Sequence, residues 1–257
     1  MRFLETSVKG QMQYRVSVFL QALGMFLVTG IEFFGIYALF DRFGSVGGWQ
    51  LAEVALFYGF VNIVFAFADA LTRGFDTLGE QIRTGSFDRF LLRPRSTVLQ
   101  LLGYEFTLRR AGRLIQGAFV FIWGWTALSV PLTQMPFILY AGISGVSLFC
   151  GILVFQGTIT FWTVETLEVM NILTYGSSQT AHFPLSVYRR GIQIFFIYFV
   201  PIGLVTHFPI CAVLGRPPFP GIPSWAGYIT PVSGPLFLCL SLLAWKIGVR
   251  HYTSTGS

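Results

Sequence analysis

Three acidic residues lie within long apolar stretches of this 257-residue sequence, namely Glu32, Glu53 and Asp69. A carboxylate inside a membrane is costly, and where one occurs it often belongs to an ion or proton path. These residues could therefore let an ion gradient drive a carrier. Glu32 and Glu53 fall toward one end of their stretches and Asp69 toward the other, so the favoured interpretation places all three near the membrane interfaces.

A serine in the fourth apolar stretch could act as a nucleophile. The residues Gly142-Ile143-Ser144-Gly145 resemble the serine motif of rhomboid-type intramembrane proteases, and His207 in the next stretch could serve as the base. Small residues are also common where membrane helices pack against each other. Because a motif without its fold context is weak, helix packing is the favoured interpretation.

The sequence contains no nucleotide-binding or zinc-protease motif. It lacks GxxxxGK[ST] and HExxH, and its two lysines, Lys9 and Lys246, do not follow a glycine-rich loop. The three cysteines show no metal-binding spacing, so we interpret them as apolar packing residues. We expect no catalytic, cofactor or metal site on this chain, and energy for transport must come from an ion gradient or from another polypeptide.

The elements that position these residues must be membrane helices. Hydrophobic residues make up 54% of the chain and charged residues only 11%, whereas an average soluble domain has about 25% charged residues. Six apolar stretches have about the 20 residues that a helix needs to cross a bilayer. The predicted spans are residues 16–40, 51–71, 114–130, 137–161, 192–210 and 228–247. We therefore predict an all-α, multi-pass membrane protein with one transmembrane domain over residues 1–257.

The basic residues indicate the orientation of these six spans. Cytoplasmic loops of membrane proteins carry an excess of lysine and arginine. With both termini in the cytoplasm, 15 of the 17 basic residues fall on the inner side, and only Arg42 and Arg216 fall outside. The net charge of +6 therefore reports the topology and does not indicate a nucleic-acid partner.

The long inner segment between the second and third spans, Thr72–Arg113, carries eight arginines around an apolar centre. Pro94 disfavours a helical conformation at Arg93, so a short helix is expected to end there. An amphipathic helix of this kind can dock to another protein or lie on anionic lipid, and amphipathicity alone leaves both interpretations open.

Three further segments have recognisable patterns. Met1–Arg15 has apolar residues at helical spacing and is predicted to be an amphipathic helix at the inner interface. Trp162–Arg190 is assigned to the inner side, with Glu165, Glu168 and Asn171 on one helix face. Cys211–Gly227 is rich in proline and is expected to fold back at the outer interface. Helix breaks are expected at four prolines, which could line a transport path or be packing kinks: Pro201, Pro209, Pro231 and Pro235.

Two cytoplasmic motifs resemble those of a known family. Residues 85–94 resemble the G-x-F-D-x-x-L-L-R-P element of ABC-2 type transporter permeases, in particular a bacterial subgroup of six-helix permeases. A second signature of that subgroup is similar to residues 161–188 of this chain. The residues that carry the first motif are Arg83, Gly85, Phe87, Asp88, Arg89, Phe90, Leu91, Leu92, Arg93 and Pro94. Those that carry the second are Trp162, Glu165, Glu168, Asn171, Tyr175, Gly176, Pro184 and Tyr188.

The resemblance implies a role that composition alone does not reveal. It implies a subunit of an ATP-driven exporter in the bacterial inner membrane, in which two permeases, of the same or different sequence, pair with two ATPase subunits. ATP and Mg²⁺ would be bound by those ATPases. The segment Arg83–Pro94 would be the coupling helix that fits a groove of the ATPase, Met1–Arg15 the interfacial connecting helix, and Cys211–Gly227 the outer re-entrant region.

Overall fold

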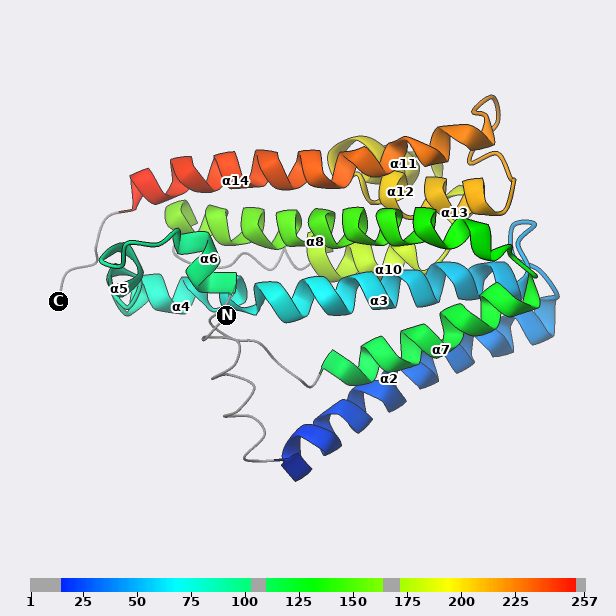
Figure 1. Ribbon diagram of the computed structural model, residues 1–257, viewed down its shortest axis with the longest axis horizontal. Coiled ribbons are helices and arrows are strands. Elements are labelled where there is room, and N and C mark those ends of the chain that lie inside the picture. The colour runs from blue at the N-terminus through cyan, green and yellow to red at the C-terminus, as the bar shows by residue number, and fades with distance from the viewer. Residues whose placement is uncertain (1–14, 103–109, 164–171, 253–257) are drawn as a thin grey trace.

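The computed structural model describes residues 15–102, 110–163 and 172–252, and it confirms the all-α prediction. The long helices lie side by side along the longest axis of the molecule (Figure 1). They are α2 (Arg15–Phe43), α3 (Leu51–Asp76), α7 (Ala111–Ala127), α8 (Met135–Thr163) and α14 (Ser233–His251). The shorter α-helices are α4 (Leu78–Arg83), α5 (Asp88–Leu91), α6 (Thr97–Leu102), α10 (Ser177–Ala181), α11 (Arg190–Ile194), α12 (Ile202–Val205) and α13 (His207–Val213). Short 3₁₀ or π turns are η2 (Leu132–Gln134), η3 (Ile172–Gly176), η4 (Leu185–Val187), η5 (Phe195–Phe199), η6 (Ser224–Tyr228) and η7 (Thr230–Val232).

Helix α3 is the centre of the structure and is buried on nearly all sides. Glycines allow its two neighbours to approach closely, because a side chain at these positions would meet the opposing helix. Gly59 of α3 faces Phe121 of α7, and Gly117 of α7 faces Asn62 of α3. On the other side, Gly145 of α8 lies against Val64. The helices α7, α3 and α8 therefore form the packed core on which the remaining helices lie.

The outer helices α2 and α14 pack less extensively. Helix α14 lies along α8, where Gly151 accommodates Phe237 and Gly248 accommodates Phe161. Helix α2 packs mainly on α7, where Gly112 lies against the backbone of Ala22. It buries few of its 29 residues. Much of the surface of α2 and α14 is thus left to lipid or to other subunits.

The described residues include four helices long and apolar enough to cross a membrane, or five if one bent pair counts as a single span. The four are Arg15–Phe43, Leu51–Arg83, Leu132–Thr163 and Ser224–His251. They cover four of the six predicted spans. The predicted third span is represented by α7, which has 17 residues and lies between α2 and α3. The predicted interfacial helix Met1–Arg15 falls almost entirely outside the described residues.

The fifth apolar stretch does not form one straight helix. It forms two helical pieces, Arg190–Phe199 and Ile202–Val213, with a bend of 77° between them. The residues just before the first piece and the start of α13 in the second piece lie at the same end of the molecule. Trp49 Nε1 donates to Ser186 Oγ (3.0 Å), and the His207 ring lies 6.1 Å from that of Trp49. Trp49 precedes the first residue of α3, whereas α4 and α5 follow its last residue. The end of the predicted inner segment Trp162–Arg190 therefore lies at the opposite end of α3 from residues 83–94, contrary to the prediction that both lie on one side.

Candidate functional site

The segment with the first motif forms a compact structure after the end of α3. Helix α4 ends at Arg83, and Gly85 follows with a φ of 67°, a left-handed conformation that glycine adopts without strain. This turn leads into α5, which ends at Leu91, two residues before the Arg93 boundary expected from Pro94. The arrangement places one face of residues 83–94 against the helix bundle and turns the other face outward.

Aromatic residues anchor the inward face. Phe87 has 0% exposure and Phe90 is also buried. The Phe87 ring lies 5.4 Å from that of Phe161 in α8 and 5.1 Å from that of Tyr252, just beyond α14. Trp245 of α14 contacts the Phe161 ring at 5.0 Å. We call this group the aromatic cluster, and its members are Phe75, Phe87, Phe90, Phe161, Trp245 and Tyr252.

Two hydrogen bonds fasten this part of the chain to the end of α14, one from residues 83–94 and one from α6, which follows them. The Tyr252 hydroxyl donates to Asp88 Oδ1 at 2.8 Å. Trp245 Nε1 donates to the Thr97 hydroxyl in α6 at 3.0 Å. Residues 83–94 are therefore tied to the end of α14 by the bond between Tyr252 and Asp88, and to α8 by the ring contact between Phe87 and Phe161.

The outward face combines positive charge with apolar side chains. Leu92 is 84% exposed and Leu91 is 43% exposed. The arginines at 83, 89 and 93 are exposed beside them, as is Pro94. Exposed leucines next to cations are suited to a protein groove that has an apolar floor and an acidic rim. Of the first-motif residues, Phe87 and Phe90 form the anchor, Asp88 and Gly85 are partly buried, and the rest form this face.

The second motif is not brought together in the structure. Trp162 lies at the end of α8, with its ring 5.6 Å from His251, whereas Tyr175 contacts Phe65 in the middle of α3. Gly176 follows Tyr175, and Glu165, Glu168 and Asn171 fall outside the described residues.

The last two residues of the second motif, Pro184 and Tyr188, flank η4. They lie at the opposite end of α3 from residues 83–94. Burial raises the pKa of Tyr188, so its hydroxyl stays protonated and donates to the carbonyl oxygen of Thr180 at 3.0 Å. The second motif therefore extends along the molecule from the end near Trp162 to the end near Trp49, and it is not one cytoplasmic cluster.

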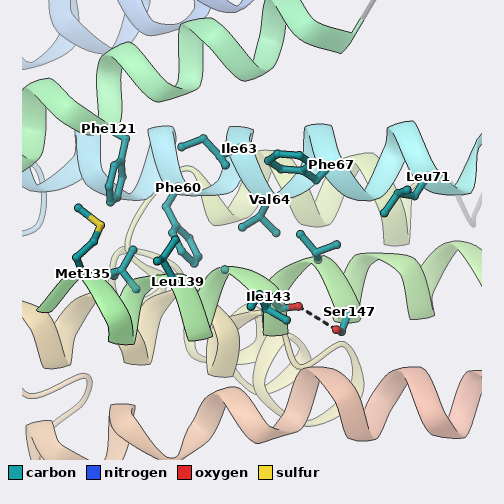
Figure 2. Close-up of a pocket in the computed structure, with 13 residues that line it drawn as sticks. Phe60, Ile63, Val64, Phe67, Leu71, Phe121, Met135, Leu139, Ile143 and Ser147 are labelled. Atoms are coloured by element: carbon teal, nitrogen blue, oxygen red, sulfur yellow. Dashed lines mark hydrogen bonds between the residues drawn. The ribbon is translucent and has the colours of Figure 1, made fainter. Parts of the chain in front are cut away.

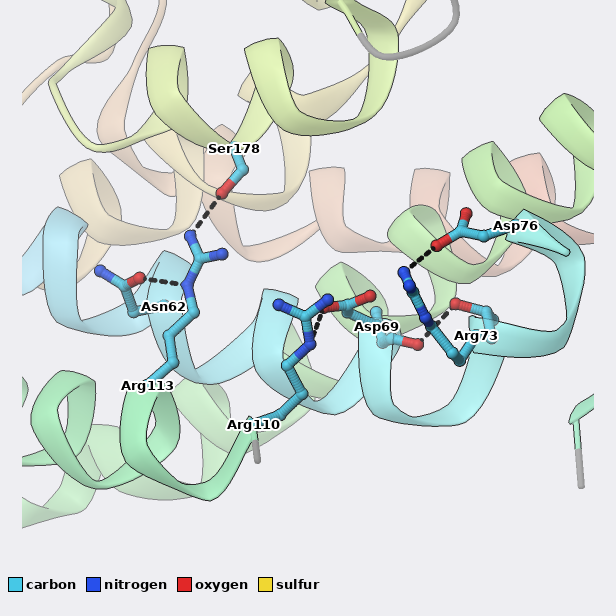
Figure 3. Close-up of polar contacts among 9 residues, drawn as sticks. Asn62, Asp69, Arg73, Asp76, Arg110, Arg113 and Ser178 are labelled. Atoms are coloured by element: carbon cyan, nitrogen blue, oxygen red, sulfur yellow. Dashed lines mark hydrogen bonds and ion pairs between the residues drawn. The ribbon is translucent and has the colours of Figure 1, made fainter. Parts of the chain in front are cut away.

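A polar group that sequence reasoning missed lies in the packed core (Figure 3). Arg113, taken as a loop residue, is buried in α7 and donates to Asn62 Oδ1 (2.6 Å) and Ser178 Oγ (3.0 Å). Its guanidinium lies 4.5 Å from the centre of the Phe65 ring. The sequence signal that could have indicated this site is Asn62, a polar residue within the second apolar stretch. The group ties α3, α7 and α10 together.

The acidic residues proposed for an ion path have different surroundings. Asp69 forms an ion pair with Arg110 at 2.5 Å. Glu53 forms one with Arg216 at 2.9 Å and accepts a hydrogen bond from the backbone of Gln50 at the start of α3. Glu32 lies on the exposed side of α2, and its nearest polar partner is the Tyr58 hydroxyl at 3.4 Å.

The residues proposed for a serine protease do not form a dyad. The Ser144 hydroxyl donates to the carbonyl oxygen of Pro231, and Ser144 is 1% exposed. His207 Nδ1 accepts from the backbone of Leu185 (3.3 Å), and Nε2 lies 2.9 Å from the carbonyl oxygen of Pro218. Both side chains connect segments of the fold, as the packing interpretation predicted.

The four prolines of the predicted helix breaks occupy helix starts. Pro201 precedes α12 at the bend between the two helical pieces Arg190–Phe199 and Ile202–Val213. Pro209 and Pro235 lie in the first turns of α13 and α14, and Pro231 lies in η7. A first turn tolerates proline, because its backbone N–H has no helical partner.

An apolar hollow of about 450 Å³ lies between α3 and α8 (Figure 2). The polar side chain in the lining of this hollow is Ser147, whose hydroxyl donates a hydrogen bond to the carbonyl oxygen of Ile143 in the same helix. The lining residues are Phe60, Ile63, Val64, Phe67, Leu71, Phe121, Met135, Ile138, Leu139, Gly142, Ile143, Val146 and Ser147. Among the described residues, no group of three or more histidine, cysteine or acidic side chains could hold a metal ion.

Comparison with known proteins gives one family match. The model of the family described as "ABC-2 family transporter protein" matches residues 26–256, which is most of the chain. No curated protein and no solved structure matches the chain.

Proposed function

This chain belongs to the ABC-2 transporter family, and from that premise we propose that it is the permease subunit of an exporter powered by a separate ATPase. The observation that carries the proposal is the two-sided coupling segment, residues 83–94. One side is fastened into the aromatic cluster, and the other presents Leu91 and Leu92 among arginines. In this proposal two copies of the ATPase bind ATP and Mg²⁺, and two permeases, identical or different, form the path.

The exposed side is the proposed docking face for the ATPase. Burial of two leucine side chains contributes about 1.5–3 kcal/mol each when it is complete, and arginines at the rim steer a partner of opposite charge. A lipid surface could also attract these arginines. The short, folded form of the segment favours the protein partner, because Gly85 and α5 hold Leu91 and Leu92 in fixed positions.

The anchored side is the proposed route by which movement enters the membrane. Closure of the ATPase dimer on ATP would displace the docking face. Phe87 and Asp88 would transmit that displacement to α8 and α14, because their partners belong to the ends of these two helices. Alternating access would then be a movement of α8 and α14 relative to the rest of the bundle.

The proposed topology has six crossings with both termini on the cytoplasmic side, as the sequence predicted, but the fifth crossing is a different segment. Tyr175 lies beside Phe65, and His182 lies beside Tyr58, so residues 172–182 follow α3 toward its start. Residues 190–213 then form a re-entrant pair at the outer side. Arg189 and Arg190 move outside in this arrangement, yet the inner side keeps its excess because the arginines between Thr72 and Arg113 remain there. We place the protein in a bacterial inner membrane.

The two alternative functions, an ion-driven carrier and an intramembrane protease, lack structural support. Two of the three acidic residues of an ion path are neutralised by arginines, and Ser144 and His207 each have other partners. The permease role therefore fits the geometry better than an ion-driven carrier or an intramembrane protease.

A double substitution on the docking face tests the proposal. Leu91→Asp with Leu92→Asp should abolish co-purification of the ATPase and leave the fold intact, since substitutions at exposed sites change stability by about 0.5 kcal/mol or less. The matched control is Leu132→Asp, an equally apolar residue that is 75% exposed in η2 at the other end of the bundle. An ATPase that still co-purifies with the double variant refutes the docking face. If no ATPase accompanies the wild-type chain from its native membrane, the permease role itself is refuted.

A further inference from the structure

Glu32 differs from the other acidic residues of the bundle. It lies on the exposed side of α2 and is the only charged residue between Arg15 and Asp41. In the part of the chain that the structure describes, it makes no ion pair. Three acidic residues of α3 each have an arginine partner: Glu53 with Arg216, Asp69 with Arg110, and Asp76 with Arg73.

Within the protein the Glu32 carboxylate interacts electrostatically with the buried Arg113 of α7, but it makes no ion pair with it and its only hydrogen bond among the described residues is long. The Tyr58 hydroxyl is 3.4 Å from Glu32 Oε2, but it is only 2.6 Å from the carbonyl oxygen of Thr29. A hydroxyl has a single proton to donate, and the shorter contact identifies Thr29 as the acceptor. The carboxylate is therefore held in place beside Tyr58 while its hydrogen-bonding capacity stays available to another molecule.

The surface around Glu32 is apolar and open. One turn before it and two turns after it, Val28 and Leu39 are exposed on the same face of α2. Gly35, three residues on, has no other part of the chain within 4 Å of the place where a side chain would begin. The carboxylate thus lies in an apolar surface, with free space at its side.

Among the described residues, the middle parts of α7, α8 and α14 do not show this pattern on their outward faces. The exposed residues of α7, α8 and α14 in mid-helix are large and apolar, as expected for contact with lipid: Phe119, Ile122, Leu139, Ile143, Leu236, Leu240 and Leu243. A charged side chain facing hydrocarbon is costly. A positively charged neighbour would therefore be stabilised at Glu32 more than a lipid chain would be.

We propose that Glu32 is the recognition site for a positively charged head group of an amphiphilic cargo, such as an ammonium or phosphonium group on an apolar body. The carboxylate binds the cation, and the surface of Val28 and Leu39 receives the apolar part. A single carboxylate suffices for an organic cation, whereas a metal ion needs several ligands. The inference rests on the proposed function, because it names the class of molecule that the permease would carry.

Binding of hydrophobic cations to the full-length permease in nanodiscs tests this assignment without the ATPase. The probes are radiolabelled tetraphenylphosphonium and dodecyltrimethylammonium, with triphenylphosphine oxide as the neutral counterpart. Wild type should bind both cations in preference to the neutral probe. Glu32→Gln should weaken binding by about tenfold or more, as expected when one member of a charge pair is lost, and Glu32→Asp should retain most of it. The control is Asp41→Asn, which neutralises another exposed carboxylate of the same helix.

Three results of the binding assay would overturn the inference. These are absence of binding by both cations, equal binding of the neutral probe, and unchanged binding by Glu32→Gln. A change of Glu32→Gln from dimer to monomer in size-exclusion chromatography would also overturn it, since the residue would then face a second permease. Loss of ATPase co-purification in the docking-face variant bears only on the proposed function, because the cation assay contains no ATPase.

Discussion

Replacing Tyr252 by phenylalanine removes one hydroxyl from the anchor of the coupling segment and leaves its ring in the aromatic cluster. The lost contact is the 2.8 Å hydrogen bond to Asp88 Oδ1. A hydrogen bond to a charged group contributes about 1.5–3 kcal/mol. Asp88 is partly exposed, so water can replace part of the interaction, and we expect a value of about 1.5 kcal/mol. That value corresponds to a roughly tenfold higher population of the detached segment.

Hydrogen exchange measures this population directly. The backbone amides of Phe87, Asp88 and Leu92 are bonded within the segment, to the carbonyl oxygens of Gln81, Gly85 and Asp88. Their exchange in Tyr252→Phe should be roughly tenfold faster than in wild type, as read by mass spectrometry of peptides over residues 81–95. Exchange in α3 and α7 should not change.

Two further variants make the measurement decisive. Tyr188→Phe removes a tyrosine hydroxyl whose bond to Thr180 lies at the other end of the bundle, and it should leave the segment's exchange at the wild-type rate. Phe87→Ala should have a larger effect than Tyr252→Phe, because truncating a buried phenylalanine costs about 3–5 kcal/mol. Wild-type exchange in both Tyr252→Phe and Phe87→Ala would show that the aromatic cluster does not hold the segment, and the proposed route to α8 and α14 would be refuted.

Three other substitutions test the contacts that position the helices. Gly112→Val should separate α2 from α7 and lower the stability by about 1–3 kcal/mol, seen as a lower thermal midpoint in detergent; an unchanged midpoint would contradict the close approach. Ser178→Ala removes one hydrogen-bond acceptor of Arg113 and should lower the stability by about 0.6 kcal/mol, and by at most about 1.7 kcal/mol. The thermal midpoint in detergent measures this loss too, and a higher midpoint would contradict the role of Ser178. Trp49→Phe removes the bond to Ser186, costs about 1 kcal/mol and should speed proteolysis of residues 185–190; unchanged proteolysis would argue against that contact.

The sequence was sufficient to predict the long helices, because each has an apolar stretch of the required length. The boundary of α7 was predicted three residues too late for a physical reason. Arg113 was read as the last residue of a charged loop, but its charge is accommodated inside the fold by Asn62 and Ser178. Such partners come from segments far apart in the chain, so hydropathy cannot reveal them. The inward anchoring of Phe87 on α8 and α14 was hidden in the same way.

The fifth crossing shows a second limit of hydropathy. Residues 172–182 are rich in serine and threonine, yet they lie along α3 in the interior of the bundle. Their hydroxyls bond to carbonyl oxygens of the preceding turn: Ser177 to Leu173, and Thr180 to Gly176. Hydroxyls that are satisfied in this way cost little inside a membrane protein. The more apolar stretch 192–210 is bent by 77° near Pro201, and His207 beyond the bend lies near Trp49, as does Ser186 before the stretch begins.

The helices of the bundle are packed in a way that suits a movement of α8 and α14 relative to α2 and α7. Helices α8 and α14 pack along each other, and Phe87 of the coupling segment contacts Phe161 of α8 and Trp245 of α14. Helix α2 has few contacts of its own and is attached mainly through α7. In the proposed mechanism, a displacement of the docking face would reach α8 and α14 first, while α2 with Glu32 would stay with α7. If Glu32 binds the cargo, the path must open and close by a change in spacing between these two groups of helices.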